Sequence, residues 1–98
     1  MKQDVRTATE VDRFVGAQLR ALRKTAGWSQ TELAKQVGVT FQQIQKYERG
    51  ANRIGASRLW QLCQVLCVQP GRFFDGVEAH LAKVEIEAND QIPRSLAS

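Results

Sequence analysis

Apolar residues recur about every three to four positions along most of the chain, a period typical of helices that bury one face. The first run predicts a helix that begins at Glu10, is capped by Thr9 and ends at Gly27. Its inward positions are Val11, Val15, Leu19, Leu22 and Ala26.

Two short helices joined by a tight turn are predicted within residues 30–50. Gly38 lies between them, where the end of the first helix favours a residue that accepts a positive φ. A hydroxyl followed three residues later by Glu or Gln matches the capping box at the start of each helix. The pairs are Ser29 with Glu32 and Thr40 with Gln43. This arrangement has helix-turn-helix spacing.

Each of these short helices has one apolar face, and small Ala34 permits their close approach. The inward residues are Leu33, Ala34 and Val37 in the first helix, Ile44 and Tyr47 in the second, and Val39 in the turn. A polar stripe lies on the opposite face of the second helix and is free to bind. It consists of Gln42, Gln45, Lys46 and Arg49.

Further along the chain, Ser57 is placed to cap a fourth helix with inward Leu59, Leu62, Cys63 and Leu66. Pro70 suits the first turn of a short fifth helix, in which Phe73 and Phe74 supply core bulk before Gly76. Beyond it, Val77, Leu81, Val84 and Ala88 could form one weak amphipathic helix. We expect a flexible arm over 1–9, a helix-turn-helix domain over 10–76, and an extension over 77–98 that is part helical and part disordered.

The positive charge is concentrated in the predicted domain. Residues 1–76 hold 12 Lys and Arg against 6 Asp and Glu, a net charge of +6, whereas residues 77–98 have a net charge of −2. A polyanionic partner is consistent with this distribution. No run approaches the length of a membrane span and the first residues are polar, so we expect a cytoplasmic protein without membrane contact.

The run SQTELAKQVGVT followed by QQIQKYERG resembles the Cro/C1-type, or XRE-like, helix-turn-helix family of prokaryotic and phage regulators. The similarity extends from Val11 to Gly76. It implies an all-α fold, a compact five-helix lambda-repressor-like DNA-binding domain, with room for one extra C-terminal helix. It also implies a homodimer on a near-palindromic double-stranded DNA operator. The extension is either a partly ordered tail or a helix that packs against a second subunit.

Groove chemistry then suggests which side chains read bases. Gln42 can pair bidentately with adenine, and Lys46 can donate to guanine. Gln45 lies between the residues expected to reach DNA bases and those expected to reach the DNA backbone. Phe41 occupies a position where related proteins often have a polar reader, and its edge could touch a thymine methyl.

Phosphate positioning is assigned to five other residues. Gln30 stands at the start of a helix, whose N–H groups and dipole face an incoming anion, as in family members. Arg49, Asn52 and Arg53 can reach flanking phosphates, and Thr40 joins them at the start of the second helix.

Glu48 is expected to face inward, because an exposed acid here would repel phosphates. In family members the matching acid pairs with an Arg of the first helix, and Arg23 aligns with that position. The resemblance therefore implies a structural ion pair.

No catalytic, metal or cofactor site is expected. His80 is a lone histidine in the extension, and no nucleophile motif or phosphate-binding glycine loop is present. Cys63 and Cys67 have a spacing that suits neither a disulfide within one helix nor a zinc site. Free thiols are expected, with redox sensing as the alternative.

Two functions follow from these observations. The first is a sequence-specific transcriptional regulator, most simply a repressor, that reads the major groove with the helix over 41–49. The second is an antitoxin or adaptor of the same fold, whose partner is another protein such as a toxin.

Overall fold

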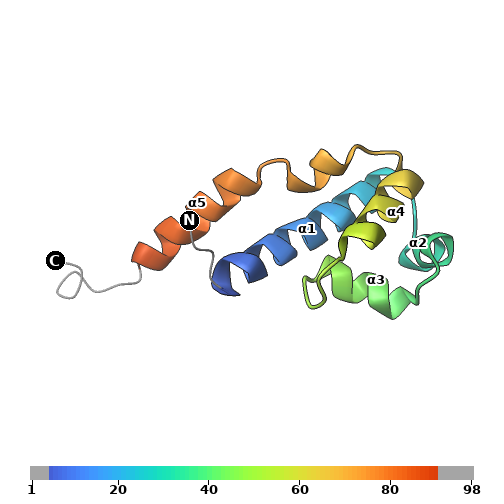
Figure 1. The fold of residues 1–98 in the computed structure, drawn as a ribbon, viewed down its shortest axis with the longest axis horizontal. Coiled ribbons are helices and arrows are strands. Elements are labelled where there is room, and N and C mark those ends of the chain that lie inside the picture. Colours follow the sequence, from blue (N-terminus) through green and yellow to red (C-terminus); the bar gives the residue numbers. More distant parts are fainter. Residues whose placement is uncertain (1–4, 91–98) are drawn as a thin grey trace.

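The computed structural model describes residues 5–90, and every regular element in this part of the chain is a helix (Figure 1). The predicted all-α fold is confirmed. The elements are α1 (Val5–Thr25), α2 (Gln30–Val37), α3 (Phe41–Glu48), α4 (Ala56–Leu66), the 3-10 helix η1 (Pro70–Phe74) and α5 (Val77–Asp90).

One core lies where α1 to α4 and η1 meet. Each of these elements contributes a large side chain that is completely buried. These are Leu19, Leu33, Ile44, Leu62 and Phe73, in chain order. Burial of such a side chain stabilises the fold by about 1.5 to 3 kcal/mol, so the five elements are held by a shared apolar centre.

Helix α1 begins at Val5, five residues before the predicted start at Glu10, and Thr9 is therefore inside the helix rather than its cap. Threonine costs at most about 0.7 kcal/mol within a helix. Further along α1, Phe14 packs against α5, and its ring centroid is 5.3 Å from that of His80. Part of the predicted arm is therefore helical, and residues 1–4 of that arm lie outside the described range.

Helices α1 and α3 approach most closely at Gly16. A Cβ atom there would lie 2.2 Å from the carbonyl oxygen of Tyr47 and 3.0 Å from that of Glu48. Gly50 forms the matching contact just after α3, because its Cβ would lie 2.7 Å from the Cα of Arg13. The C-terminal end of α3 is therefore seated directly on the backbone of α1.

The end of α2 is joined to α4 by side chains. The carbonyl of Val37, the last residue of α2, accepts hydrogen bonds from the guanidinium of Arg58 and, at 3.2 Å, from the amide of Gln61. Carbonyls at a helix end have no partner within the helix, so these two donors satisfy one of them.

The start of α4 departs from expectation. The helix begins at Ala56 with Gly55 in the N-cap position, so Ser57 is not the cap. The Gly55 carbonyl already accepts from Leu59 at 2.9 Å, which starts the helix one turn before Leu59. At the other end Cys67 takes the left-handed conformation, with φ 55° and ψ 45°, that glycine adopts more readily.

Only one of the two phenylalanines of η1 belongs to the core. Phe73 is fully buried, whereas Phe74 is 42% exposed, so the expectation that both fill the core is wrong for Phe74. Successive residues in a 3-10 helix point about 120° apart, and both rings cannot face one side.

The extension forms α5, which runs beside the N-terminal half of α1 (Figure 1). Its predicted inward residues Val77, Leu81, Val84 and Ala88 are all partly buried, while Ile86 on the other face is 60% exposed. Residues 91–98 of the predicted tail lie outside the described range.

Candidate nucleic-acid interface

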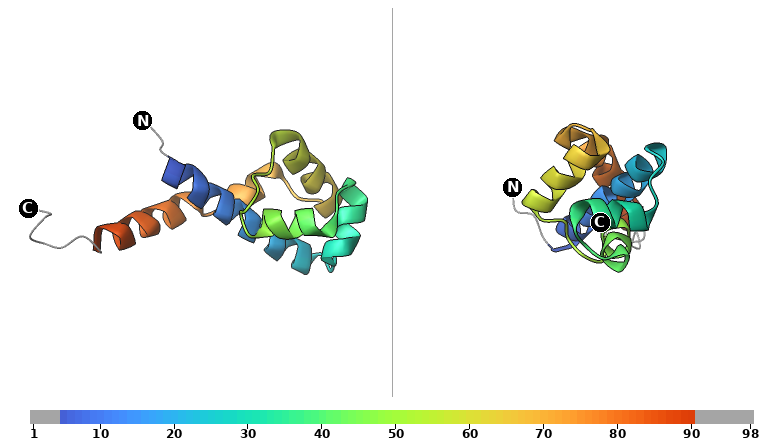
Figure 2. Two further views of the ribbon diagram at one scale, coloured as in Figure 1. Left: turned by 90° about the horizontal axis from the view of Figure 1, so that it is seen from below. Right: turned by 90° about the vertical axis from the view of Figure 1, so that its right-hand side faces the viewer.

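Helix α3 lies at an edge of the molecule in two perpendicular views, with α1 and α4 on its inner side (Figures 1 and 2). Ile44 and Tyr47 are buried and anchor it to the core. The residues on its outer face are exposed or partly buried.

The start and the end of α2 have the cap and the glycine turn that the sequence predicted. The Ser29 hydroxyl accepts from the N–H of Glu32 at 3.0 Å, and the Glu32 carboxylate accepts from the N–H of Ser29 at 3.0 Å. The backbone N–H of Ser29 lowers the pKa of the Glu32 carboxyl most strongly, and the Ser29 side chain lowers it further. Gly38 ends α2 with φ 75° and ψ 33°. The entry and exit of α2 are therefore both fixed within its own sequence.

The second capping box is only half formed. The Thr40 hydroxyl accepts from the N–H of Gln43 at 3.2 Å, as expected. The Gln43 side chain does not return to Thr40, because its carbonyl oxygen accepts from the amide of Asn52 at 3.2 Å. Gln43 thus connects α3 to the loop that follows it. Local sequence patterns do not predict this role.

The predicted base-reading residues share the outer face of α3. Phe41 is 43% exposed, Gln42 and Lys46 are exposed, and Gln45 is partly buried. Their side chains point away from the core, which meets the geometric requirement for base contact. Which bases each one contacts stays a prediction.

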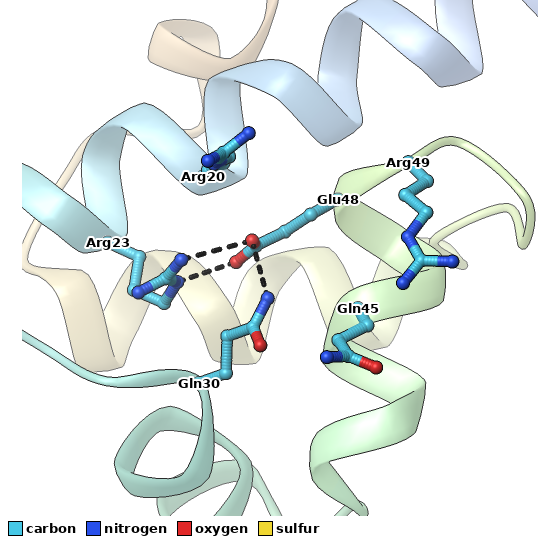
Figure 3. A pocket seen from close by; sticks show the side chains of 6 residues that line it. All are labelled: Arg20, Arg23, Gln30, Gln45, Glu48 and Arg49. Atoms are coloured by element: carbon cyan, nitrogen blue, oxygen red, sulfur yellow. Dashed lines mark hydrogen bonds and ion pairs between the residues drawn. The ribbon is translucent and has the colours of Figure 1, made fainter.

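A buried ion pair supports this face from behind. The guanidinium of Arg23 donates to both carboxylate oxygens of Glu48, at 2.6 and 3.1 Å, and to the carbonyl of Trp28 at 2.8 Å. Gln30 donates to the same carboxylate at 3.1 Å (Figure 3). The Arg23 and Glu48 side chains are only 9% and 4% exposed. One cluster thus joins the end of α1, the start of α2 and the end of α3.

The residues assigned to phosphate positioning occupy different environments. Arg49 is exposed, and no ion pair involves it among the residues that the structure describes. Arg53 is exposed but lies 3.1 Å from the carboxylate of Asp12. Asn52 donates to Gln43, and Gln30 to Glu48, so these two amides already brace the protein. Arg49 is therefore the cation of this set that has no ion pair in the described part of the chain, and which of these residues contacts a phosphate stays a prediction.

The two thiols are free, Cys63 buried and Cys67 exposed. Burial raises the pKa of the Cys63 thiol, which keeps it in the less reactive protonated form. Over residues 5–90 no group of His, Cys, Asp or Glu side chains is arranged to hold a metal ion. No helix in that range is long and apolar enough to cross a membrane.

Comparison with known families decides the class of this domain. Residues 19–73, which contain the ion pair, α2, the turn and α3, match the Helix-turn-helix family HTH_3. This chain belongs to that Cro/C1-type helix-turn-helix family. HTH_3 is a family of DNA-binding transcriptional regulators, not of enzymes, as the sequence predicted.

Curated HTH_3 relatives resemble the chain closely. An uncharacterised HTH-type transcriptional regulator (y4wC) of Sinorhizobium fredii is 43% identical over 91 residues, which cover 93% of this chain and 64% of the relative. An uncharacterised transcriptional regulator in the ATPase CF(0) region of Rhodospirillum rubrum is 47% identical over 79% of this chain and 71% of its own length. The chain thus spans about half to two-thirds of several relatives.

Solved structures agree with the HTH_3 assignment. The clp gene regulator ClgR of Corynebacterium glutamicum has a TM-score of 0.70 at 26% identity, covering 81% of this chain and 87% of that one. The restriction-modification controller protein C.AhdI of Aeromonas hydrophila has a TM-score of 0.60 at 30% identity, covering 65% and 96%.

Proposed function

We propose that this chain is a sequence-specific transcriptional repressor that binds double-stranded DNA as a homodimer, with α3 in the major groove. The proposal is supported most directly by Gln42, Gln45 and Lys46, two amides and a cation on the outer face of α3, a helix that the Arg23–Glu48 pair braces from behind. Amides and cations are the groups that recognise base edges in the major groove. Two such helices in a dimer would meet half-sites roughly 34 Å apart on one side of the duplex.

Selection of bound duplexes from random DNA tests the proposal. We expect a near-palindromic sequence to be enriched, and an excess of random DNA to fail to displace the protein from it. Repression would then appear as lower transcription from a promoter that contains the selected site. Failure to enrich any sequence, together with co-purification of a tight stoichiometric protein partner, would favour the adaptor alternative instead.

Replacement of Gln42 by Ala should reduce discrimination at one base pair of the selected site by about 1 to 3 kcal/mol, because a bidentate amide contact to adenine is lost. Binding to duplexes with each substitution at that position measures the effect. Gln64→Ala is the matched control, since Gln64 is an exposed amide on α4. An equal loss of affinity for all sequences would show that Gln42 positions the protein without reading a base.

We infer that the outer face of α5 forms part of the dimer interface. Ile86 is 60% exposed there, although the opposite face of the same helix is covered by α1. Ile86→Glu should therefore convert the dimer to monomer at concentrations where the unmodified chain is dimeric, as measured by light scattering. Circular dichroism should show unchanged helix content. An intact dimer, both in this variant and after truncation following Gly76, would remove α5 from the interface.

A further inference from the structure

A polar pocket of about 360 Å³ lies beside α3, on the side of the Arg23–Glu48 pair. Six side chains from three helices line it: Arg20 and Arg23 of α1, Gln30 of α2, and Gln45, Glu48 and the C-cap residue Arg49 at α3 (Figure 3). Three of the six are arginines, which is the side chain best suited to phosphate recognition.

The single acid of the pocket is already neutralised. Glu48 lies at the floor and receives hydrogen bonds from Arg23 and Gln30, and its side chain is 4% exposed. Arg20 and Arg49, in contrast, are exposed and make no ion pair with any residue in the described part of the chain. Three guanidinium groups against one carboxylate give the pocket a formal charge of +2.

The two unpaired arginines come from opposite walls. Arg20 projects from α1 and Arg49 from the end of α3, with the amide of Gln45 on the α3 wall (Figure 3). An anion seated between these walls would receive charged donors from both helices. Binding it would also offset the repulsion between exposed cations.

We propose that this pocket seats one backbone phosphate of the bound duplex, and that Arg20 is a phosphate contact outside the helix-turn-helix unit. The inference rests on the proposed function, because Gln45 lies both in the pocket and on the reading face of α3. A phosphate held here would fix the depth and rotation of α3 in the groove, since phosphate contacts set register and orientation. Free phosphate has the same chemistry, and the experiment below distinguishes the two sources.

The test measures affinity for the selected duplex and for a random duplex over a series of salt concentrations. For a dimer with about six phosphate contacts, log affinity should fall against log salt with a slope of roughly −5. Arg20→Gln should make this slope less steep by roughly 2, one contact from each protomer, and should weaken both duplexes alike, roughly five- to tenfold for each contact. Arg20→Lys should retain the slope, because it keeps the charge.

Arg72→Gln is the matched control. It removes the same charge from η1, where Arg72 is paired with Asp75 at 3.2 Å, and η1 lies across α1 from α3 (Figure 1). Its slope should equal that of the unmodified chain. A slope unchanged in Arg20→Gln would overturn the phosphate contact while leaving the proposed function intact. Failure of the unmodified chain to bind any duplex would overturn the proposed function itself.

Neutral methylphosphonate substitutions identify the phosphate source. Substituting the backbone phosphates of the selected duplex one at a time should reveal a position where the unmodified protein loses affinity and Arg20→Gln loses nothing further. That coupling supports a DNA phosphate. If no position is coupled to Arg20, but inorganic phosphate inhibits DNA binding more than chloride at equal ionic strength and only when Arg20 is present, the pocket binds free phosphate and the proposal is overturned.

Discussion

Replacement of Arg23 by Ala should lower the free energy of unfolding by about 3 to 5 kcal/mol, because it leaves the buried carboxylate of Glu48 without its cation. The Trp28 carbonyl would lose a hydrogen-bond donor as well. For a domain of this size the melting temperature should fall by roughly 12 °C or more. Thermal and urea denaturation, followed by circular dichroism, measure both quantities.

A double variant separates the contribution of the ion pair to stability from that of the aliphatic parts of the two side chains. Arg23→Met combined with Glu48→Leu removes both charges and keeps apolar volume, so it should recover most of the stability lost in Arg23→Ala. DNA binding provides a second readout, because the pair joins the end of α1 to the end of α3. An Arg23→Ala variant with the same melting temperature as the unmodified chain would refute the structural role of the pair.

Replacement of Gly16 by Ala should destabilise the fold by about 3 kcal/mol, because the new methyl group would lie 2.2 Å from a main-chain carbonyl oxygen of Tyr47. Helix propensity alone predicts the opposite sign, since Ala stabilises a helix interior by about 1 kcal/mol relative to Gly. The sign of the change in unfolding free energy therefore tests the close approach of α1 and α3.

Gly71→Ala is the matched control for this change. A methyl group at Gly71 would meet no atom within 4 Å outside its own and the adjoining stretch of chain, and the φ of Gly71 is not in the left-handed region. The control should alter stability by less than about 0.5 kcal/mol. A Gly16→Ala variant as stable as this control would show that α3 can move away from α1 without cost.

Local chemistry explains why much of the site could be predicted. The cap at Ser29, the turn at Gly38 and the inward faces of α2 and α3 depend on residues only a few positions apart, so they are visible in the sequence. The pairing of Arg23 with Glu48 spans 25 positions, and only the family resemblance suggested it.

Other features depend on contacts between distant segments and could not be predicted in the same way. Position 16 has to be glycine because the backbone of α3 lies against it. Gln43 bonds to Asn52 instead of completing the capping box with Thr40. Arg20 belongs to the pocket because α1 passes beside α3. In each case the partner is identified only after the chain has folded.

Helix α1 contacts two other helices within one of its turns. Phe14 meets His80 of α5, and two residues later Gly16 receives the end of α3. If α5 forms the proposed dimer interface, a change in the angle between α5 and α1 would alter the orientation of α3 relative to the second subunit. The separation between half-sites that such a dimer accepts would then depend on how α5 is attached to the rest of the protein.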